Sequence, residues 1–385
     1  MTHPHPWTLG AVGDVFVHRP DPSTAFEHSR ELLGAVDVLF GNCEGAYTDR
    51  PSPSPGGGWS VLSPAGHADA LGPAGFDVMA VANNHALDGG FTGLEDTLGR
   101  LHAQGIRTVG AGADLARARE PVVVEHGPTR VGFVAFSCVH PPGYAARART
   151  PGVSAVRVES HYHLPDDDPY AYIEPGAVPK VRTFPRAEDA AVVAEAVTRL
   201  AGEADVVVAS FHWGTSREPA VLADYERILG RLAVDAGADV VLGHHHHLLR
   251  GVEFHAGKPI FYGLGHFVFD QVTEWSEEEL AYLRSLGEYG IYPRDGYPLL
   301  PFHPDGRLTV LAALEFRGNR LARAGMVPCV ISPANHAVPA APDTADGRRV
   351  LAYVRQVSER AGLPTGYAEG TFTIGGFAGF EALPR

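Results

Sequence analysis

Cysteines, long apolar runs and clusters of basic residues are all scarce in this chain of 385 residues. Its three cysteines (Cys43, Cys138 and Cys329) are widely spaced and odd in number, which excludes a disulfide framework. No apolar run approaches the roughly 18 residues that a transmembrane helix needs. Residues 1–7 lack the basic start and apolar stretch of a secretory signal. We therefore expect a cytoplasmic protein that has no membrane partner.

Positive charge is also in deficit. The net charge is −14, from 45 acidic and 31 basic residues, and no long basic run interrupts the chain. This balance argues against nucleic acid or an anionic membrane as the main partner. Hydrophobic residues make up 45% of the chain and charged residues 20%, which is ordinary for a globular protein. The partner we expect is a small-molecule or short peptide-like substrate.

What the chain does contain is a regular alternation of short apolar segments and helical patterns. The predicted strands cover residues 7–12, 36–40, 76–82, 131–136, 206–210 and 240–242. The predicted helices cover residues 93–104, 188–201 and 223–236. Residues 258–269, 308–316 and 321–331 are predicted to be strands of a more antiparallel kind, the last two forming a hairpin at Gly318-Asn319. The pattern predicts an α/β fold with mixed sheets.

One domain is expected over residues 8–331, with insertions at about 141–185 and 274–304 that are rich in proline or tyrosine. Each insertion is either a lid over a site or a plain surface excursion. A third irregular stretch, Arg50 to Gly58, is predicted to be a mobile loop. Residues 332–385 are expected to add a helix (347–361) and a tail that pack on the same domain.

Four consecutive histidines, His244 to His247, follow the apolar run Ala238 to Leu242. Neutral imidazole is the commonest side-chain metal ligand, and α/β sheets place their sites at the carboxyl ends of strands. The other predicted strands also end on side chains that suit a metal: Asp14, Glu44, Asn84, His85 and His212.

Any one of these residues has an ordinary structural explanation. Asp14 can be a turn residue or helix cap, Glu44 a loop carboxylate, and His212 a core histidine. Suitable side chains at so many strand ends are together hard to explain by turns and packing. The pattern therefore favours a metal site that serves hydrolysis, because divalent cations lower the pKa of water and stabilise charged oxygens.

Within the histidine run, alternate side chains of an extended backbone point the same way. Either His245 and His247 converge on the site, or His244 and His246 do. Geometry alone allows both registers.

The order of these motifs resembles the CapA-type (poly-γ-glutamate capsule synthesis) family, a branch of the calcineurin-like metallophosphoesterase superfamily. The resemblance covers about Thr8 to Ile331 and rests on six segments: Gly13-Asp14-Val15, Gly41-Asn42-Cys43-Glu44, Ala82 to Gly90 around Asn83-Asn84-His85, His212-Trp213-Gly214, Gly243 to His247, and Gly257 to Asp270. It implies a four-layer α/β/β/α sandwich with mixed sheets.

The resemblance also implies site residues. The family's Gly-x-His-Pro-His motif selects His245 and His247, and Glu44 becomes the expected bridge between two divalent cations, Mn, Fe or Zn. His85 would donate a proton to the leaving group, with Asp88 orienting it. The implied metal ligands are Asp14, Glu44, Asn84, His212, His245 and His247. Residues expected near the substrate or behind the ligands are Asn42, His244, His246, His266 and Arg217.

Three positions depart from the pattern. His246 stands in place of the motif's proline, and His266 in place of a usual asparagine, where it can add a hydrogen bond or contact substrate. Phe16 occupies the histidine position of the superfamily's Asp-x-His motif, which CapA-type members generally lack. One metal is therefore expected to be held more loosely, or to rely on Glu44 and water.

Three functions fit this site. The first is hydrolysis of an amide-type bond, such as a γ-glutamyl link, in a carboxylate-bearing substrate. The second is a phosphoesterase, which should show arginines or lysines beside the metals; Arg19, Arg217, Arg250 and Lys258 form no obvious cluster, and arginines of the first insertion can instead bind a carboxylate. The third is a non-catalytic metal-binding component of a polymer-synthesis complex. The lack of an anchor favours an enzyme, and the first function is slightly preferred.

Overall fold

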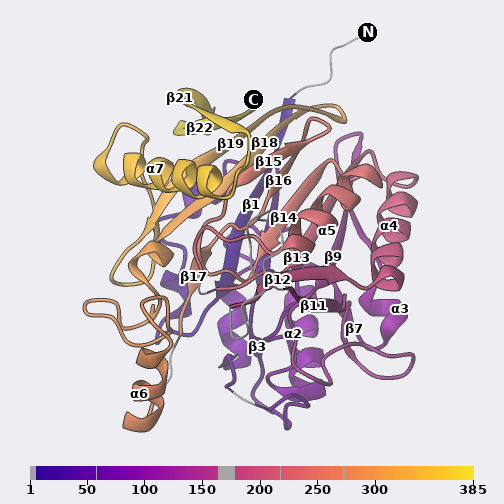
Figure 1. Cartoon of the computed structure of the whole chain (residues 1–385), viewed down its shortest axis with the longest axis vertical. Coiled ribbons are helices and arrows are strands. Elements are labelled where there is room, and N and C mark those ends of the chain that lie inside the picture. The colour runs from indigo at the N-terminus through magenta and orange to yellow at the C-terminus, as the bar shows by residue number, and fades with distance from the viewer. Residues whose placement is uncertain (1–5, 58, 164–177, 217, 272–273) are drawn as a thin grey trace.

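The computed structural model describes residues 6–57, 59–163, 178–216, 218–271 and 274–385 (Figure 1). Its larger sheet has ten strands, and the predicted segments of both halves of the chain contribute to it. These strands are β1 (Pro6–Phe16), β2 (Val38–Cys43), β5 (Val78–Ala80), β6 (Arg107–Val109), β17 (His266–Phe269), β18 (Leu308–Arg317), β19 (Arg320–Ile331), β20 (Ala337–Pro339), β21 (Thr365–Ile374) and β22 (Phe377–Pro384).

The larger sheet is mixed, which confirms the predicted α/β class. Its order is β21-β22-β19-β18-β1-β2-β5-β6, with β17 also beside β1 and β20 beside β19. Strands β1, β2, β5 and β6 are parallel, and β18 and β19 form the antiparallel hairpin expected at Gly318-Asn319. The expectation that the segment before this hairpin is antiparallel is wrong for β17, which runs parallel to β1.

The second sheet has six strands in the order β15-β16-β14-β13-β9-β8. Its inner strands are parallel and its two edge strands are antiparallel to their neighbours. The strands are β8 (Val122–His126), β9 (Thr129–Ser137), β13 (Val206–His212), β14 (Val240–His244), β15 (Val252–His255) and β16 (Lys258–Phe261). Short two-stranded sheets join β3 (Ala46–Tyr47) to β4 (Leu62–Ser63) and β7 (Ala111–Gly112) to β10 (Gly152–Val153).

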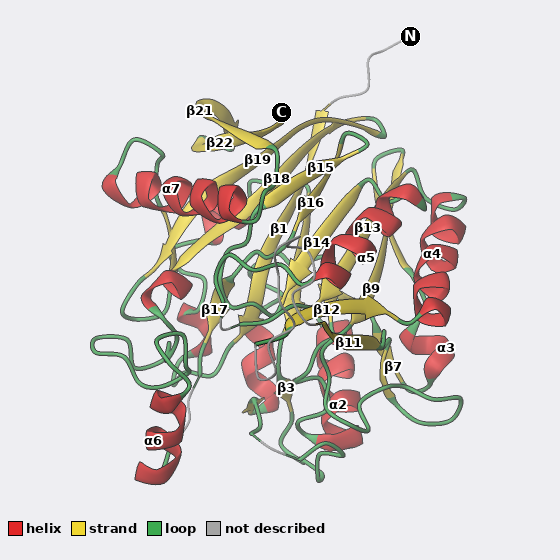
Figure 2. Ribbon diagram, viewed as in Figure 1, coloured by secondary structure: helices red, strands yellow, loops and turns green. Residues whose placement is uncertain are grey.

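Seven α-helices and three short 3-10 helices accompany the sheets in the described residues (Figure 2). The α-helices are α1 (Arg30–Leu33), α2 (Gly90–Ala103), α3 (Leu115–Ala118), α4 (Ala187–Ala201), α5 (Asp224–Asp235), α6 (Glu277–Ser285) and α7 (Ala345–Arg360). The 3-10 helices are η1 (Pro22–Thr24), η2 (Ala65–Ala70) and η3 (Pro304–Arg307).

The buried apolar side chains lie in three main clusters because successive residues of a strand face opposite sides of its sheet. Val206 and Val208 of β13 pack with residues of β1 and β2 in a cluster shared by the two sheets, where Phe40 stacks on Phe133. Val207 and Ala209 face the other way, against α4 and α5. A third cluster joins the larger sheet to α2 and η2.

The regions expected to be irregular contain regular structure. The first insertion holds β10 and the hairpin of β11 (Val158–His163) and β12 (Lys180–Pro185), with residues 164–177 outside the described residues. The second insertion holds α6, which begins with a Ser276–Glu279 capping box. The expected C-terminal tail is instead the hairpin β21–β22, which pairs with β19. The sequence of these stretches shows no clear helical or strand periodicity, so these strands and helix α6 were not predicted.

The loop around Ser52 and Ser54 was predicted to be mobile, but it is held by specific contacts. Ser52 N donates to Gly89 O at 2.9 Å, and Ser54 Oγ lies 2.8 Å from the hydroxyl oxygen of Tyr144.

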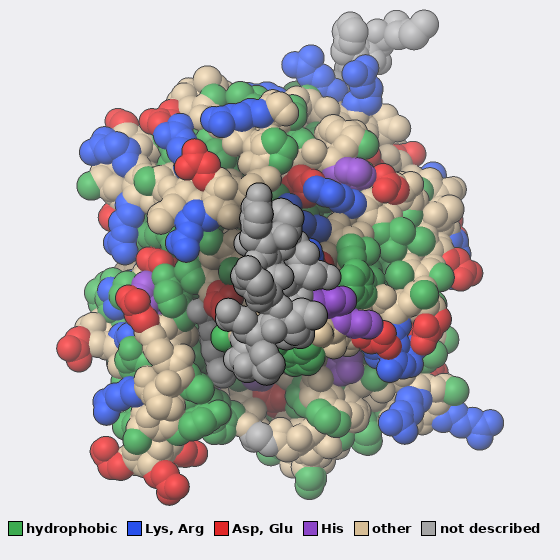
Figure 3. Space-filling model, in the orientation of Figure 1, with side chains coloured by type: hydrophobic (Ala, Val, Ile, Leu, Met, Phe, Trp, Pro, Cys, Tyr) green, Lys and Arg blue, Asp and Glu red, His purple; other side chains and the backbone are tan. Residues whose placement is uncertain are grey.

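Two further observations concern the outside of the molecule. On the face seen in Figure 3, acidic and basic side chains are interspersed. Of the helices that the structure describes, none combines the length and the apolar character needed to cross a membrane.

Candidate metal centre

Asp14 reaches the centre through an irregularity at the end of β1. The pairing of β1 with β2 shifts between Ala11 and Asp14, and its pairing with β17 shifts between Asp14 and Val15. Such bulges re-aim a side chain next to functional sites. The Asp14 carboxylate is fully buried, and the side-chain amide of Asn42 donates to its Oδ1 at 2.9 Å.

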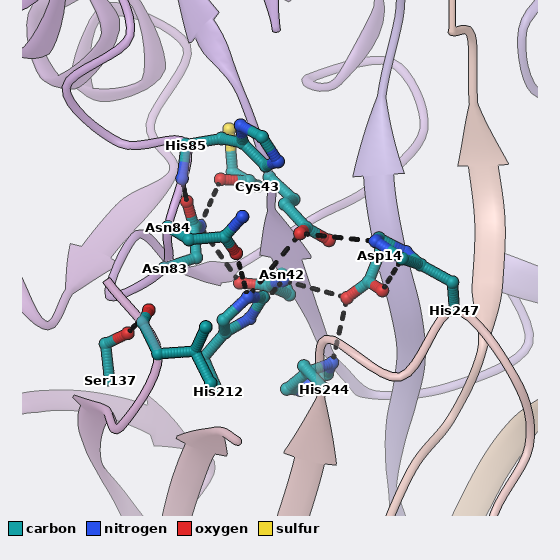
Figure 4. Close-up of polar contacts among 12 residues, drawn as sticks. Asp14, Asn42, Cys43, Asn83, Asn84, His85, Ser137, His212, His244 and His247 are labelled. Carbon is teal, nitrogen blue, oxygen red and sulfur yellow. Dashed lines mark hydrogen bonds and ion pairs between the residues drawn. The ribbon is translucent and has the colours of Figure 1, made fainter. Parts of the chain in front are cut away.

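The histidine run approaches Asp14 from the end of β14, in the other sheet (Figure 4). His247 Nδ1 lies 3.3 Å from Asp14 Oδ2, and His244 Nδ1 lies 3.6 Å from Asp14 Oδ1. His245 and His247 have φ values of 89° and 57°, in the left-handed region that non-glycine residues rarely adopt. The run is therefore no extended strand, and simple alternation does not describe it.

His246 contacts Glu226 of helix α5 rather than a carboxylate of the centre. Its Nε2 lies 2.8 Å from Glu226 Oε2, and both side chains are fully buried. Glu226 Oε1 also accepts from the backbone N–H of Ala223, at the start of α5. This pair fixes the middle of the loop, so that the strained residues on either side keep their conformation.

Glu44 lies between the two halves of the centre. His212 Nε2 is 3.4 Å from Glu44 Oε1, and His247 Nε2 is 3.8 Å from the same oxygen. His212 Nε2 is also 2.5 Å from Asn84 Oδ1. Residues from strand ends of both sheets thus meet at one point, as Figure 4 shows.

The buried carboxylates of this centre lack the hydrogen bonds that burial normally requires. In the described parts of the chain, both Glu44 oxygens and Asp14 Oδ2 have no hydrogen-bond partner. A buried charge without a partner is costly unless a cation balances it. The centre contains three sets of residues, and within each set the donor atoms lie within 4.8 Å of one another. The sets are Asp14, Glu44 and His212; Glu44, His245 and His247; and Asp14, His247 and His266. This set of carboxylate and imidazole donors fits divalent Mn, Fe or Zn.

Protonation of the centre follows from burial and from neighbouring charges. Burial, followed by the nearby Asp14 carboxylate, raises the pKa of Glu44 well above its usual value. Burial acts in the same direction on Asp14, but the imidazoles of His244 and His247 outweigh it and hold the pKa of Asp14 well below its usual range. Burial lowers the pKa of His212 and of His245. Neutral imidazoles are the form that binds a metal.

His85 lies beside the centre and is held from behind. Its Nδ1 lies 2.7 Å from Asp88 Oδ2, and the hydroxyl of Tyr144 donates to Asp88 Oδ1 at 2.6 Å. The backbone N–H of Val61 donates to Asp88 Oδ2. His85 retains 19% exposure of its side chain, whereas Asp88 is buried. Asp88 engages only the Nδ1 atom of His85.

The residues expected near the ligands have different locations. Asn42 bonds Asp14, and His244 also contacts Asp14, whereas His246 bonds Glu226. His266 lies beside Asp14 and His247. Arg217 lies outside the described residues.

Two aromatic residues near the centre were missed by the sequence reasoning. Tyr144 belongs to the first insertion, and Phe302, from the second, packs on His247 and His266 with ring centroids 4.7 Å and 4.3 Å away. Both insertions therefore contribute to the surroundings of the site. Neither residue carries a local signal, because a single aromatic in an irregular stretch has no periodicity.

Most of the basic side chains considered for anion binding have other partners. Arg19 forms two hydrogen bonds with Asp270, and Lys258 forms an ion pair with Asp239. Arg157, Arg182 and Arg186 of the first insertion and its continuation pair with acidic residues. Arg250 donates from Nη2 to Thr215 O, whereas its buried Nε and Nη1 have no hydrogen-bond partner among the described residues. A cluster of arginines or lysines is thus not seen beside the metal donors within the described residues.

These observations define an α/β protein with mixed sheets and a candidate centre for divalent cations. The model of the bacterial capsule synthesis protein family (PGA_cap) matches residues 8–271. The chain belongs to this family, which confirms the CapA-type resemblance.

Individual relatives match this chain to different extents. The protein y4sH of Sinorhizobium fredii is 28% identical over 92% of this chain and 90% of its own. The PGA biosynthesis protein CapA of Bacillus subtilis is 32% identical over 68% of this chain and 62% of its own. The crystal structure of a hypothetical protein from Thermus thermophilus has a TM-score of 0.45 and 16% identity, covering 83% of this chain and 98% of that one.

Proposed function

We propose that this chain is a metal-dependent hydrolase with a dinuclear centre, built on the α/β/β/α sandwich of the calcineurin-like metallophosphoesterases. The observation that carries the proposal is that three of the four oxygens of two buried carboxylates, Asp14 and Glu44, have no hydrogen-bond partner among the described residues. Imidazoles from three strand ends surround them. Such a set is unfavourable as it stands and becomes favourable around cations.

In this proposal Glu44 would be a donor to both cations. Asp14 and His247 would hold the first, and Asn84, His212 and His245 would hold the second. Bound there, the cations would lower the pKa of water and stabilise negative charge on substrate oxygens. Asn42 positions Asp14 by donating to Oδ1.

His85 supplies the proton for the leaving group. With Nδ1–H donating to the Asp88 carboxylate, only the doubly protonated imidazolium carries a second proton on Nε2, so His85 would act as the acid in that form and return to neutral imidazole after the transfer. Asp88 is itself fixed by Tyr144 and by the backbone of Val61. Imidazole, carboxylate and hydroxyl thus form a chain that orients the acid.

An amide bond in a carboxylate-bearing, small or peptide-like substrate is the preferred target, with a γ-glutamyl link as the first candidate. Two observations support it over a phosphoester. Relatives include a PGA biosynthesis protein, CapA, of Bacillus subtilis. In addition, the described arginines and lysines do not gather at the centre, whereas phosphate sites ordinarily use them.

The test is turnover by the purified chain supplied with Mn²⁺ or Zn²⁺, on a γ-glutamyl anilide and on a chromogenic phosphodiester. We expect hydrolysis of the anilide, and a loss of about 10²–10⁴-fold in kcat for His85→Ala with metal content retained. His255→Ala is the matched control, because His255 also lies 2.7 Å from an aspartate, Asp235, but at the surface.

Each other outcome has a definite meaning. Turnover of the phosphodiester alone would assign the chain as a phosphoesterase. If neither substrate reacts and His85→Ala binds metal like the wild type, the chain is a non-catalytic metal-binding component of a polymer-synthesis complex.

A further inference from the structure

We propose that His266 is itself a metal ligand, which completes the donor set on the Asp14 side of the centre. The assignment rests on the metal centre of the proposed function. It adds His266 to the donors named for that centre.

The backbone places His266 beside Asp14. Strand β17 runs parallel to β1 with Asp14 opposite His266, and the Asp14 N–H donates to Gly265 O at 2.9 Å. This approach depends on Gly13, because a Cβ at that position would lie 1.9 Å from Gly265 O. Any larger residue at position 13 would push β17, and with it His266, away from Asp14.

The side chain of His266 has the arrangement of a ligand. It is fully buried, and its Nε2 has no hydrogen-bond partner among the described residues. Its Nδ1 lies 3.5 Å from Gly306 O. A metal-bound imidazole usually turns its second nitrogen toward a backbone carbonyl, which fixes the tautomer and frees the other nitrogen for the metal.

His266 also faces the correct neighbours. Its ring stacks on that of His247, with centroids 4.6 Å apart and an angle of 18°. Donor atoms of Asp14, His247 and His266 lie within 4.8 Å of one another. With the shared Glu44, they give the four protein donors that a divalent transition metal commonly takes.

Strand β1 offers no alternative donor at this position. Phe16, two residues after Asp14, is buried in the apolar cluster against Tyr47 and Phe269. Simple packing does not account for His266 either, although its ring touches Phe302. A phenyl ring would pack there equally well, whereas an imidazole nitrogen buried without a partner is costly.

The experiment compares wild type, His266→Asn, His266→Gln and His336→Asn by metal content after dialysis and by titration with Co²⁺ followed by visible absorption. His336→Asn is the control because it dismantles a separate surface group, Glu27, His28 and His336, that could collect adventitious metal. The circular dichroism of each metal-free variant verifies that it folds.

We expect both His266 variants to bind one of about two metals at least 10–100-fold more weakly, with an altered Co²⁺ spectrum, while His336→Asn matches the wild type. In addition, the cobalt-loaded wild type should show a contact-shifted imidazole N–H signal from His266 by NMR, a measurement that needs no variant.

Wild-type affinity and spectrum in His266→Asn, or no shifted signal from His266, would overturn the assignment. Dependence of metal binding on His266 without any turnover would uphold it and defeat only the hydrolase proposal. A wild type that binds no metal would overturn both.

Discussion

Two of the buried carboxylate sites among the described residues differ in how their charges are balanced. In the first, which we call the Asp270 cluster, Asp270 is fully buried, and both of its oxygens accept hydrogen bonds. Arg19 donates to each oxygen at 2.8 Å and 2.6 Å, Asn335 to Oδ1 at 2.6 Å, and the backbone of His18 to Oδ2 at 2.9 Å. The chain itself therefore supplies hydrogen bonds to both oxygens of the Asp270 carboxylate.

The second is the pair Asp14 and Glu44, equally buried, with three of its four oxygens lacking a hydrogen bond within the described residues. Their neighbours are imidazoles rather than a guanidinium, and burial makes the imidazoles of His212 and His245 prefer the neutral form. The difference teaches that burial alone does not identify a site. The state of the partners does, because a satisfied carboxylate stabilises the fold and an unsatisfied one requires a cation.

The largest expected effect comes from breaking the Asp270 cluster. Asp270→Ala would leave the buried Arg19 guanidinium without its carboxylate, and should lower the free energy of unfolding by about 3–5 kcal/mol. Denaturant unfolding measures this effect. The folded variant should still bind metal. Loss of metal binding at unchanged stability would show that Asp270 serves the metal centre rather than the stability of the fold.

Glu44→Gln should weaken metal binding without destabilising the metal-free fold. We expect metal affinity to fall at least about 100-fold, which is about 2.7 kcal/mol, because the bridging carboxylate is gone. Above the ordinary pKa of a glutamate, the metal-free variant should be more stable than the metal-free wild type, since the buried Glu44 must either stay charged or take up a proton on folding and a glutamine needs neither. Calorimetric titration and unfolding in a chelator measure the two effects. If metal-free Glu44→Gln is less stable than the metal-free wild type, the contrast between the Asp270 cluster and the pair Asp14 and Glu44 is wrong.

Glu226 is an intermediate case, partnered by His246 and a backbone N–H. Burial raises the pKa of Glu226 from 4.5 to about 8. The folded state therefore holds this proton more tightly than the unfolded state, and between about pH 4.5 and 8 the group reduces stability as pH rises.

The expected slope is on the order of 1 kcal/mol per pH unit at most. Glu226→Gln should lack this contribution, so its stability relative to the wild type should increase from about pH 5 to about pH 8 in metal-free unfolding experiments. A constant difference across that range would refute the assignment of the raised pKa.

The smallest effect is expected at Tyr144. Tyr144→Phe removes the hydrogen bond to Asp88 and should cost about 1 kcal/mol of stability. It should also lower kcat up to about tenfold with little change in KM, because the acid is less well oriented. Ser54→Ala is the control, since Ser54 contacts the same hydroxyl but not Asp88. Equal kcat values for the two variants would argue against a positioning role.

Much of the framework was predictable because its signals are local. Apolar strands such as β13 and β14 end on polar residues, and the carboxyl ends of parallel strands meet at one edge of a sheet. Helices α4 and α5 begin and end close to their predicted limits, because their apolar residues recur at helical spacing. The terminal hairpin β21–β22 was missed, since its pairing partner β19 is distant in sequence.

The sequence by itself therefore determined which chemical groups stand at the strand ends and that they suit a metal. Only the tertiary structure decided which of them face one another. The left-handed backbone at His245 and His247 turns His246 toward Glu226, and the pairing of β17 with β1 brings His266 to Asp14. The hydrogen bond from Tyr144 to Asp88 likewise depends on the folded position of the first insertion. These contacts join residues far apart in the chain, and no local preference of the backbone encodes them.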